Sequence, residues 1–223
     1  MQEKVYHFVR SLALKRKLNL INSFSTEEKK LLDIGCGTGD FLQTIQQDNW
    51  MVSGIEPDEN ARQIANSKTN NVVSDIDQMT LFESHSFDVI TLWHVLEHLP
   101  NLDEQISMLK RLLKKKGSLV IAVPNFKSFD ANYYKEFWAA YDVPRHLWHF
   151  DKDAISKLFG ADKMRLVETR PMKFDSYYVS LLSEKYKSGR MKPFKSFWIG
   201  WRSNWKAKRS KNYSSLIYIF KNE

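Results

Sequence analysis

The chain of 223 residues contains a single cysteine and none of the usual marks of a secreted or membrane-spanning protein. Cys36 cannot form an internal disulfide, so the reducing cytoplasm is the expected compartment. The apolar runs are too short to cross a bilayer, and the amino end shows no secretory-signal pattern. These absences favour a cytoplasmic globular protein.

Acidic residues are missing from one long segment. Residues 185–211 hold ten lysines and arginines and no aspartate or glutamate. The net charge is +8, so the rest of the chain carries two net negative charges. The basic character therefore belongs to one segment, and the whole protein need not bind polyanions. The length and the hydrophobic content of 43% predict one domain with an elaboration.

Glycine is scarce, yet three glycines stand at alternate positions in one turn. The apolar run 30–34 is followed by Gly35, Gly37 and Gly39 and then by a helical pattern. This order predicts a buried strand, a tight turn and a helix. Glycine permits backbone angles that side chains forbid and lets a ligand approach closely. The free N–H groups at the helix start then face that ligand.

A second strand is expected over residues 50–55, and it ends in Glu56, Pro57 and Asp58. A carboxylate at the tip of the second strand is where doubly wound folds bind ribose hydroxyls. Asp58 is a candidate N-cap for the next helix. The glycine spacing differs from that of dinucleotide-binding folds, whose third glycine comes one residue later. A dehydrogenase is therefore a poor match.

Four stretches resemble motifs of class I S-adenosylmethionine-dependent methyltransferases, and the resemblance covers about residues 30–125. They are Leu32 to Gly39, Gly54 to Pro57, Phe87 to Ile90, and Val95 to Leu99. The family's fold is α/β, a Rossmann-like doubly wound sheet of seven strands with the last strand antiparallel. The resemblance implies that fold here, and it implies S-adenosylmethionine as the cofactor.

The resemblance also assigns cofactor contacts to positions that match the family's motifs. Asp33 would orient the glycine turn, and an acidic residue after the third strand would bind adenine. The implied cofactor-binding residues are Asp33, Gly35, Cys36, Gly37, Gly39, Glu56, Pro57, Asp75, Ile76 and His94. As an alternative, Asp75 caps a turn, and Cys36 is simply a small residue in a tight turn.

The chain divides by pattern into an N-terminal segment, 1–26, and a methyltransferase domain, 27–223. Residues 3–22 show helical apolar spacing and predict a helix that acts as a lid or as plain packing. Insertions are expected at about 124–150 and 171–212. The lysines at 114–116, before Gly117, are interpreted as the end of a helix.

The stretch His94-x-x-Glu97-His98 matches an inverted zinc-protease pattern, but its place after the fourth strand favours the cofactor fold. Ubiquinone-pathway O-methyltransferases have Glu-x-x-Glu-His at the matching position. This chain has His94 in place of the first glutamate, so we expect no metal. His94 is predicted to line the methyl-transfer site, with Glu97 and His98 orienting the loop.

The first insertion carries Asp142, Arg145 and His146 around a proline, in a segment expected to cover the acceptor pocket. His146 is a candidate general base, because imidazole titrates near neutrality. The alternative is that Arg145 and His146 pair with Asp142 and hold the shape of the loop. The sequence leaves both open.

The second insertion contains aromatic residues at helical spacing among lysines and arginines, over residues 190–211. Such a helix can pack its aromatics inward, lie on an anionic membrane or bind nucleic acid. Base-amino methylases of the resembled family carry an Asn/Asp-Pro-Pro-Tyr signature, and the fourth strand here ends instead in Thr91, Leu92, Trp93 and His94, which argues against nucleic acid.

The predicted activity is methyl transfer from S-adenosylmethionine to a small-molecule or lipid-linked acceptor, with His94 and His146 as catalytic candidates. The alternative is a non-catalytic S-adenosylmethionine-binding protein that docks on a membrane or anionic partner through its basic aromatic helix. Whether oxygen, nitrogen or carbon receives the methyl group stays open.

Overall fold

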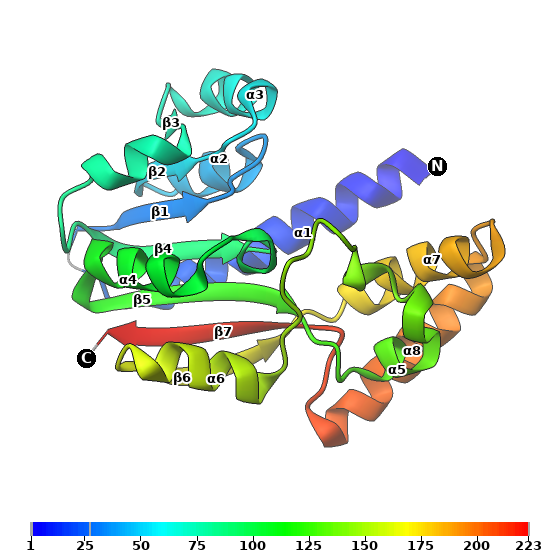
Figure 1. Cartoon of the computed structure of the whole chain (residues 1–223). Helices are drawn as coiled ribbons and strands as arrows, with labels where there is room; N and C mark the ends of the chain where they lie inside the picture. The colour runs from blue at the N-terminus through cyan, green and yellow to red at the C-terminus, as the bar shows by residue number, and fades with distance from the viewer. Residues whose placement is uncertain (1, 27, 223) are drawn as a thin grey trace. The chain divides into compact units, whose positions relative to one another are not determined.

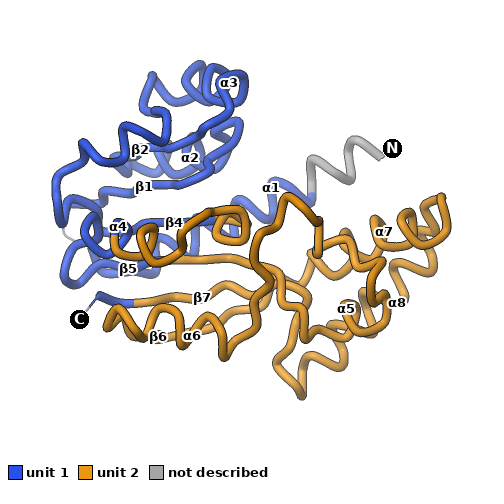
Figure 2. Tube along the Cα trace, in the orientation of Figure 1, with its two compact units in different colours: residues 1–92, 108–119, 221–223 blue, residues 93–107, 120–220 orange. Residues whose placement is uncertain are grey.

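The structure is a computed structural model that describes residues 2–26 and 28–222, with side chains from Val9 onward. The chain divides into two compact units, coloured separately in Figure 2. Unit 1 comprises residues 1–92, 108–119 and 221–223, and unit 2 comprises residues 93–107 and 120–220.

The strands form a seven-stranded sheet in the order β3-β2-β1-β4-β5-β7-β6. Their bounds are β1 (Lys30–Ile34), β2 (Met51–Ile55), β3 (Val73–Ser74), β4 (Phe87–Trp93), β5 (Leu113–Pro124), β6 (Met164–Pro171) and β7 (Ser215–Asn222). Strand β1 pairs in parallel with β2 and β4, and β2 with β3. The arrow of β7 points against that of β5 in Figure 1. The predicted α/β sheet with an antiparallel last strand is confirmed.

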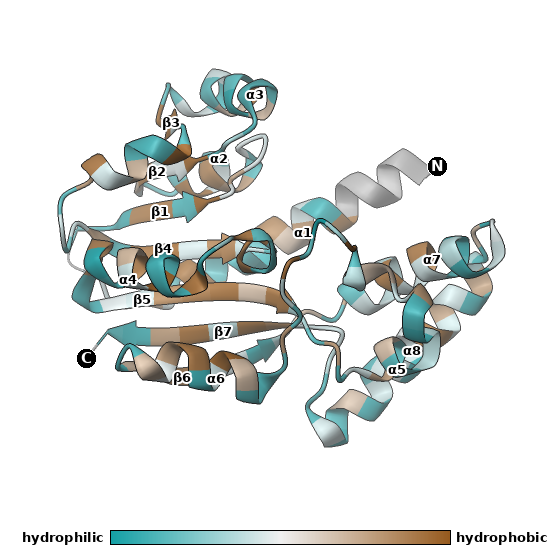
Figure 3. Ribbon diagram, viewed as in Figure 1, coloured by the Kyte–Doolittle hydropathy of each residue, from teal (hydrophilic) through white to brown (hydrophobic). Residues whose placement is uncertain are grey.

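The central strands are mainly apolar and buried, as expected of parallel strands that are covered on both faces. Leu31 and Leu32 of β1 are fully buried, and so is Val89 of β4. Figure 3 shows the same hydrophobic character along much of β4 and along the later part of β5. Burial of these side chains fixes the carboxyl ends of β1 and β2, where the glycine turn and Glu56 follow.

The helices connect these strands and fill both predicted insertions. The α-helices are α1 (Gln2–Asn22), α2 (Asp40–Gln46), α3 (Glu59–Thr69), α4 (Leu102–Leu112), α5 (Phe129–Tyr134), α6 (Lys152–Ala161), α7 (Asp175–Ser188) and α8 (Pro193–Ser210). The 3₁₀ helices are η1 (Ile76–Leu81), η2 (Leu96–His98), η3 (Lys135–Phe137) and η4 (Ala139–Tyr141). Asp58 caps α3 by accepting from the Ala61 N–H, as predicted.

The prediction that the lysines at 114–116 end a helix is wrong. Helix α4 ends at Leu112, and all three lysines lie in β5. The Lys114 ammonium lies 3.3 Å from the buried Asp88 carboxylate, and the Lys116 carbonyl accepts from the Lys221 ammonium at 3.1 Å. These contacts with Asp88 and Lys221 hold residues 114–116 in the strand, although the lysines followed by a glycine had suggested the end of a helix.

Within unit 2, helices α5, α7 and α8 share a core that includes Tyr134, Trp138 and Ile199. Asp130 of α5 is fully buried beside it and accepts hydrogen bonds from Trp138, Ser203 and Ser214. Among the described residues, every helix is too short or too polar to cross a bilayer.

Candidate functional site

The glycine turn between β1 and α2 has the geometry that its sequence predicts. Gly35, Gly37 and Gly39 have φ angles of +68°, +54° and +77°. A β-carbon on Gly39 would lie 2.9 Å from the Cα of Ala65, so close packing of α2 on α3 requires glycine there. A β-carbon on Gly37 would meet no atom within 4 Å. Gly37 thus faces open space that a ligand can occupy.

Glu56, at the end of β2, is buried and bonded to the glycine turn. Its Oε2 accepts from the Gly37 N–H at 2.7 Å, and its Oε1 accepts from the Asp58 N–H at 3.0 Å. Pro57 stands between Glu56 and the N-cap of α3. Each carboxylate oxygen keeps a second lone pair, so Glu56 can still accept two hydroxyl groups.

Asp33 precedes this turn and Cys36 lies within it, and both side chains are buried. Burial raises the pKa of Asp33 to about 7, although its carboxylate accepts a hydrogen bond from Thr91 at 2.5 Å. Burial also raises the pKa of the Cys36 thiol, which therefore stays protonated. A β-carbon on Gly54 would come within 2.9 Å of the Cys36 sulfur. Cys36 is thus a packed, unreactive thiol.

Asp75 and Ile76 follow β3 and begin η1. The Asp75 carboxylate accepts from the Ile76 N–H at 2.6 Å and lies 3.1 Å from the Arg62 guanidinium. The capping alternative is therefore observed, and the adenine contact of these residues stays a prediction. Arg62, which the sequence analysis missed, also donates to the Glu56 carbonyl at 2.6 Å. The sequence signal that could have found Arg62 is its position one helical turn after the Asp58 cap, which turns its side chain back toward Glu56 and Asp75.

Helix α1 contacts the start of α2 inside unit 1. Arg10 pairs with Asp40, which also lies 3.0 Å from the Lys68 ammonium. Lys17 lies 5.5 Å from the ring centroid of Phe41 and electrostatically favours the charged form of Asp33. The basic face of the predicted N-terminal helix therefore lies beside the glycine turn.

His94, in unit 2, directly follows β4 and has a positive φ of 59°. Its Nε2 lies 3.0 Å from the Asp175 carboxylate, and its Nδ1 lies 3.4 Å from Glu97 Oε1. Although burial lowers the pKa, these two carboxylates raise it to about 10. The ring keeps about a third of its surface exposed (35%), which limits the burial penalty. Near neutrality His94 is an imidazolium, so it can orient or donate but cannot accept a proton.

His146 lies in the loop between η4 and α6. Its Nδ1 bonds the Ala140 carbonyl at 2.9 Å, and its Nε2 is 3.9 Å from the Asp142 carboxylate. Burial lowers its pKa, so the ring is neutral and can accept a proton at Nε2. Arg145 pairs with Asp142 at 2.7 Å, as the loop-shaping alternative requires. Both predicted roles of the loop are compatible with this geometry.

The structure connects the two histidine segments inside unit 2 through Glu97. The Glu97 carbonyl accepts from the N–H groups of Leu147 and Trp148 at 2.8 and 3.2 Å. The predicted cofactor residues before Leu92 all lie in unit 1, whereas His94 and His146 lie in unit 2. The sequence analysis missed Asp175, the partner of His94, because the two are 81 positions apart and no motif joins them.

Helix α8 turns its aromatic side chains away from the unit 2 core. Five aromatics are between 43% and 93% exposed, namely Phe194, Phe197, Trp198, Trp201 and Trp205. The buried face is built from smaller residues, and a β-carbon on Gly200 would lie 2.9 Å from the Cα of Tyr177 in α7. The interpretation that the aromatics pack inward is wrong, because close packing against α7 leaves room only for small side chains.

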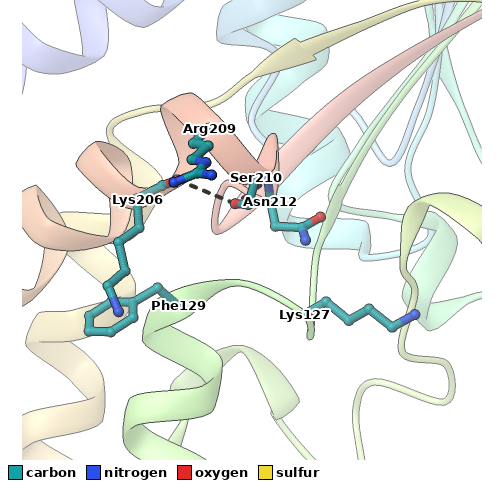
Figure 4. Close-up of a pocket in the computed structure, with 6 residues that line it drawn as sticks. All are labelled: Lys127, Phe129, Lys206, Arg209, Ser210 and Asn212. Carbon is teal, nitrogen blue, oxygen red and sulfur yellow. Dashed lines mark hydrogen bonds between the residues drawn. The ribbon is translucent and has the colours of Figure 1, made fainter.

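A basic hollow of about 590 Å³ lies at the end of this helix, as Figure 4 shows. The described residues that line it are Lys127, Phe129, Lys206, Arg209, Ser210 and Asn212, and none of the six is acidic. The Lys206 ammonium lies 4.4 Å from the centroid of the Phe129 ring. The basic hollow and the exposed aromatic side chains of α8 together place cations beside apolar surface on one part of unit 2.

Comparison with known proteins agrees with this geometry. A ubiquinone biosynthesis O-methyltransferase from Glaesserella parasuis is 37% identical over 108 residues, which cover 44% of this chain and 46% of the relative. The chain thus matches less than half the length of that curated relative.

Two solved structures share the fold. One is a SAM-dependent methyltransferase from Archaeoglobus fulgidus, with a TM-score of 0.64 and 19% identity over 95% of this chain and 94% of the other. The other is phosphoethanolamine N-methyltransferase 2 from Haemonchus contortus in complex with S-adenosyl-L-methionine. Its TM-score is 0.62 at 16% identity, with 96% of this chain and 52% of the other covered. At these identities the likeness shows the fold alone.

The family model described as a methyltransferase domain matches residues 2–167, about three quarters of the chain. The match includes the glycine turn, Glu56, Asp75, His94 and His146, and it ends before α7. The chain belongs to the methyltransferase-domain family.

Proposed function

We propose that this chain transfers a methyl group from S-adenosylmethionine to the hydroxyl group of a small or lipid-linked acceptor. The observation that carries the proposal is the open glycine turn bonded to Glu56, in a chain of the methyltransferase-domain family. The printed name of the Glaesserella parasuis relative, an O-methyltransferase, supports an oxygen acceptor.

The residues of unit 1 fit the cofactor by shape and by charge. Open space at Gly37 admits the methionine and sugar portions along the backbone of Gly35 to Gly39. The spare lone pairs of Glu56 accept the two ribose hydroxyls. Asp75 and Ile76 are proposed to contact the adenine. When bound, the cofactor supplies a methyl group on a sulfonium, and the protein's task is to hold the acceptor in line with it.

The residues of unit 2 are proposed to handle the acceptor and its proton. His146 is neutral, and its bond to the Ala140 carbonyl leaves the lone pair on Nε2, so it is the better base for an acceptor hydroxyl. His94 carries a positive charge, which suits it to orient an electron-rich acceptor and the cofactor's carboxylate. Helix α1, with Arg10 and Lys17 toward the glycine turn, is proposed to act as the lid of the 27–223 domain.

Transfer of label from methyl-tritiated S-adenosylmethionine tests the activity. The acceptors are a panel of phenols and catechols with and without an isoprenoid tail, and Glu56→Ala is the inactive control. We expect label in the organic phase with wild type, reduced at least about 100-fold in Glu56→Ala. If the protein binds the cofactor but labels none of these acceptors, the non-catalytic binder is the better description.

A specific observation also favours a membrane partner. The exposed aromatics of α8 alternate with Lys195, Arg202 and Lys206, and the basic hollow lies at the end of the same helix. Aromatic side chains insert at the headgroup level of a bilayer, and cations favour anionic lipids. We propose that residues 190–211 bind an anionic membrane surface, which would bring a lipid-linked acceptor to the enzyme.

Co-sedimentation with phosphatidylglycerol vesicles tests this contact. A variant with Trp198, Trp201 and Trp205 changed to serine should bind at least about 10-fold more weakly, because it loses the inserting side chains. Leu81→Ser, at an exposed apolar residue of unit 1, is the control. Equal sedimentation of the triple variant and wild type would remove the membrane from the proposal.

The cytoplasm remains the proposed compartment. The single cysteine is a free thiol buried in unit 1, which suits a reducing environment. Attachment to the cytoplasmic face of a membrane through α8 is consistent with that compartment, because that face carries the anionic lipids.

A further inference from the structure

Three side chains of unit 2 bring possible metal ligands together. One ligand atom each of Glu97, His98 and His146 lies within 4.8 Å of the other two. Glu97 and His98 belong to η2, and His146 comes from the first insertion, 48 positions later. Two imidazoles and one carboxylate are a common ligand set for divalent transition metals in proteins.

Glu97 is buried without the hydrogen bonds that a carboxylate needs. It is 1% exposed, and within the described structure neither of its side-chain oxygens has a hydrogen-bond partner. His94 Nδ1 lies 3.4 Å from Oε1, which is an ion-pair distance without hydrogen-bond alignment. Burying a charged group with unmade bonds is costly, so such a group calls for a ligand. A cation beside Oε2 of Glu97 would supply the direct partner that this carboxylate lacks.

In both imidazoles the nitrogen that is left for a metal is Nε2. His98 Nδ1 lies 3.0 Å from the Arg145 carbonyl, and His146 Nδ1 lies 2.9 Å from the Ala140 carbonyl. A carbonyl oxygen only accepts hydrogen bonds, so each Nδ1 carries the proton and each Nε2 keeps its lone pair. Carbonyl partners of this kind orient metal-binding histidines. The two rings lie 4.6 Å apart, edge to face.

The two segments that carry the ligands are fastened to each other. Besides the two bonds to the Glu97 carbonyl, the Trp148 indole donates to the Leu99 carbonyl at 2.9 Å. These bonds hold His146 beside η2 without any ion. His98 is exposed, so a metal from solvent has a path to the cluster.

We propose that Glu97, His98 and His146 bind a divalent transition-metal ion, with Zn²⁺ the best match. Tetrahedral zinc would place ligand atoms about 3.4 Å apart, so the side chains need to close by at most about 1.4 Å from the present limit of 4.8 Å. Imidazole ligands disfavour Mg²⁺ and Ca²⁺, which prefer oxygen. Three protein ligands leave a fourth position for water or for an oxygen of a bound molecule.

This site departs from the sequence-based expectation of no metal, which considered only the segment 94–98. It does not depend on methyl transfer or on S-adenosylmethionine. A bound metal would occupy Nε2 of His146 and would replace that imidazole as the group that promotes loss of an acceptor proton.

Calorimetric titration of the tag-free, chelator-treated protein with ZnCl₂ tests the site, with no cofactor present. Wild type should bind one Zn²⁺ per chain with a dissociation constant of about 1 μM or lower, and Mg²⁺ at least about 100-fold more weakly. Glu97→Gln and His146→Asn should each weaken Zn²⁺ binding at least about 100-fold. Co²⁺ should give visible absorption bands that both substitutions abolish.

His149→Asn is the matched control, because His149 lies in the same loop with Nε2 bonded to the Tyr141 carbonyl. It should bind Zn²⁺ as wild type does. Circular dichroism of each variant checks the fold, and Glu97→Gln keeps the shape of the side chain. The proposal is overturned if wild type binds no Zn²⁺ below about 1 mM. Equal binding by Glu97→Gln, or equal affinity for Mg²⁺, would overturn it too.

Discussion

Two buried carboxylates, Glu56 in unit 1 and Asp130 in unit 2, have different kinds of partner. In unit 1, Glu56 accepts from the N–H groups of Gly37 and Asp58, both close to it in sequence. In unit 2, Asp130 accepts from three side chains, of which Ser203 and Ser214 are more than 70 positions away. Glu56 keeps two lone pairs for a ligand, whereas three side chains of unit 2 already donate to Asp130. The partners of a buried carboxylate therefore indicate whether it serves binding or folding.

Glu97 resembles neither Glu56 nor Asp130 in its hydrogen bonding. It is as buried as Asp130 but lacks a hydrogen bond to its side chain. Its Oε1 lies 3.4 Å from Nδ1 of the positively charged His94, three residues earlier in the chain. Glu184 of unit 2 also lacks hydrogen bonds to its carboxylate, but it is paired with the Lys195 ammonium at 2.8 Å. By the same comparison, Glu97 is a carboxylate of unit 2 that a ligand would complete.

The largest expected effect comes from removing the Asp130 carboxylate, which accepts three buried hydrogen bonds. Asp130→Ala leaves the Trp138 indole and two buried hydroxyls without an acceptor, so the free energy of unfolding should fall by about 3–5 kcal/mol. Urea denaturation measures it. Glu136→Ala, at an exposed residue of the same unit, should change it by less than about 0.5 kcal/mol. A loss below about 1 kcal/mol for Asp130→Ala would show that the network is not what holds the helices.

Two substitutions in the glycine turn separate folding from binding within unit 1. Gly39→Ala should cost about 2–4 kcal/mol of stability, because it combines a positive φ with a clash against Ala65. Gly37→Ala meets no neighbour, so it should cost only about 1–2 kcal/mol and should mainly weaken S-adenosylmethionine binding. Urea denaturation and calorimetry measure the two effects. If Gly37→Ala binds the cofactor as wild type does, Gly37 does not face the ligand.

Asp33 should make the stability of unit 1 depend on pH. Its pKa is about 7 in the folded chain and near its ordinary value when unfolded. The folded state therefore holds more protons between about pH 4 and pH 7, and stability falls as pH rises through that window. Asp33→Asn should remove the slope and exceed wild type at pH 8 by about 1–3 kcal/mol. An unchanged slope in the variant would mean that Asp33 is ionised in the folded chain.

The sequence predicted unit 1 well because its features are local. The glycine turn, Glu56 and the Asp58 cap lie within 24 residues, and a strand followed by a tight turn has few alternatives. The lysines at 114–116 were misjudged because a local helix-stop pattern cannot report a distant partner such as Asp88. The adenine contacts of Asp75 and Ile76 remain predictions.

Unit 2 was less predictable because its contacts join distant segments. Periodicity found the α8 helix, but the aromatic spacing did not decide between inward packing and a surface role, and of these the inward packing is wrong. The small residues at 196, 200, 203 and 207 mark the face that packs, since bulky residues cannot approach α7 so closely. The approach of His146 to Glu97, and that of Asp175 to His94, depends on how the insertions fold, which no spacing reveals.

Calorimetric titration of the purified protein with S-adenosylmethionine, and separately with NAD, tests the central claim most directly. The account predicts one S-adenosylmethionine per chain at micromolar affinity, loss of that binding in Glu56→Ala, and no binding of NAD. Glu59→Ala, at an exposed residue three positions later, should bind like wild type. Binding of NAD in place of S-adenosylmethionine, or unchanged affinity in Glu56→Ala, would contradict it.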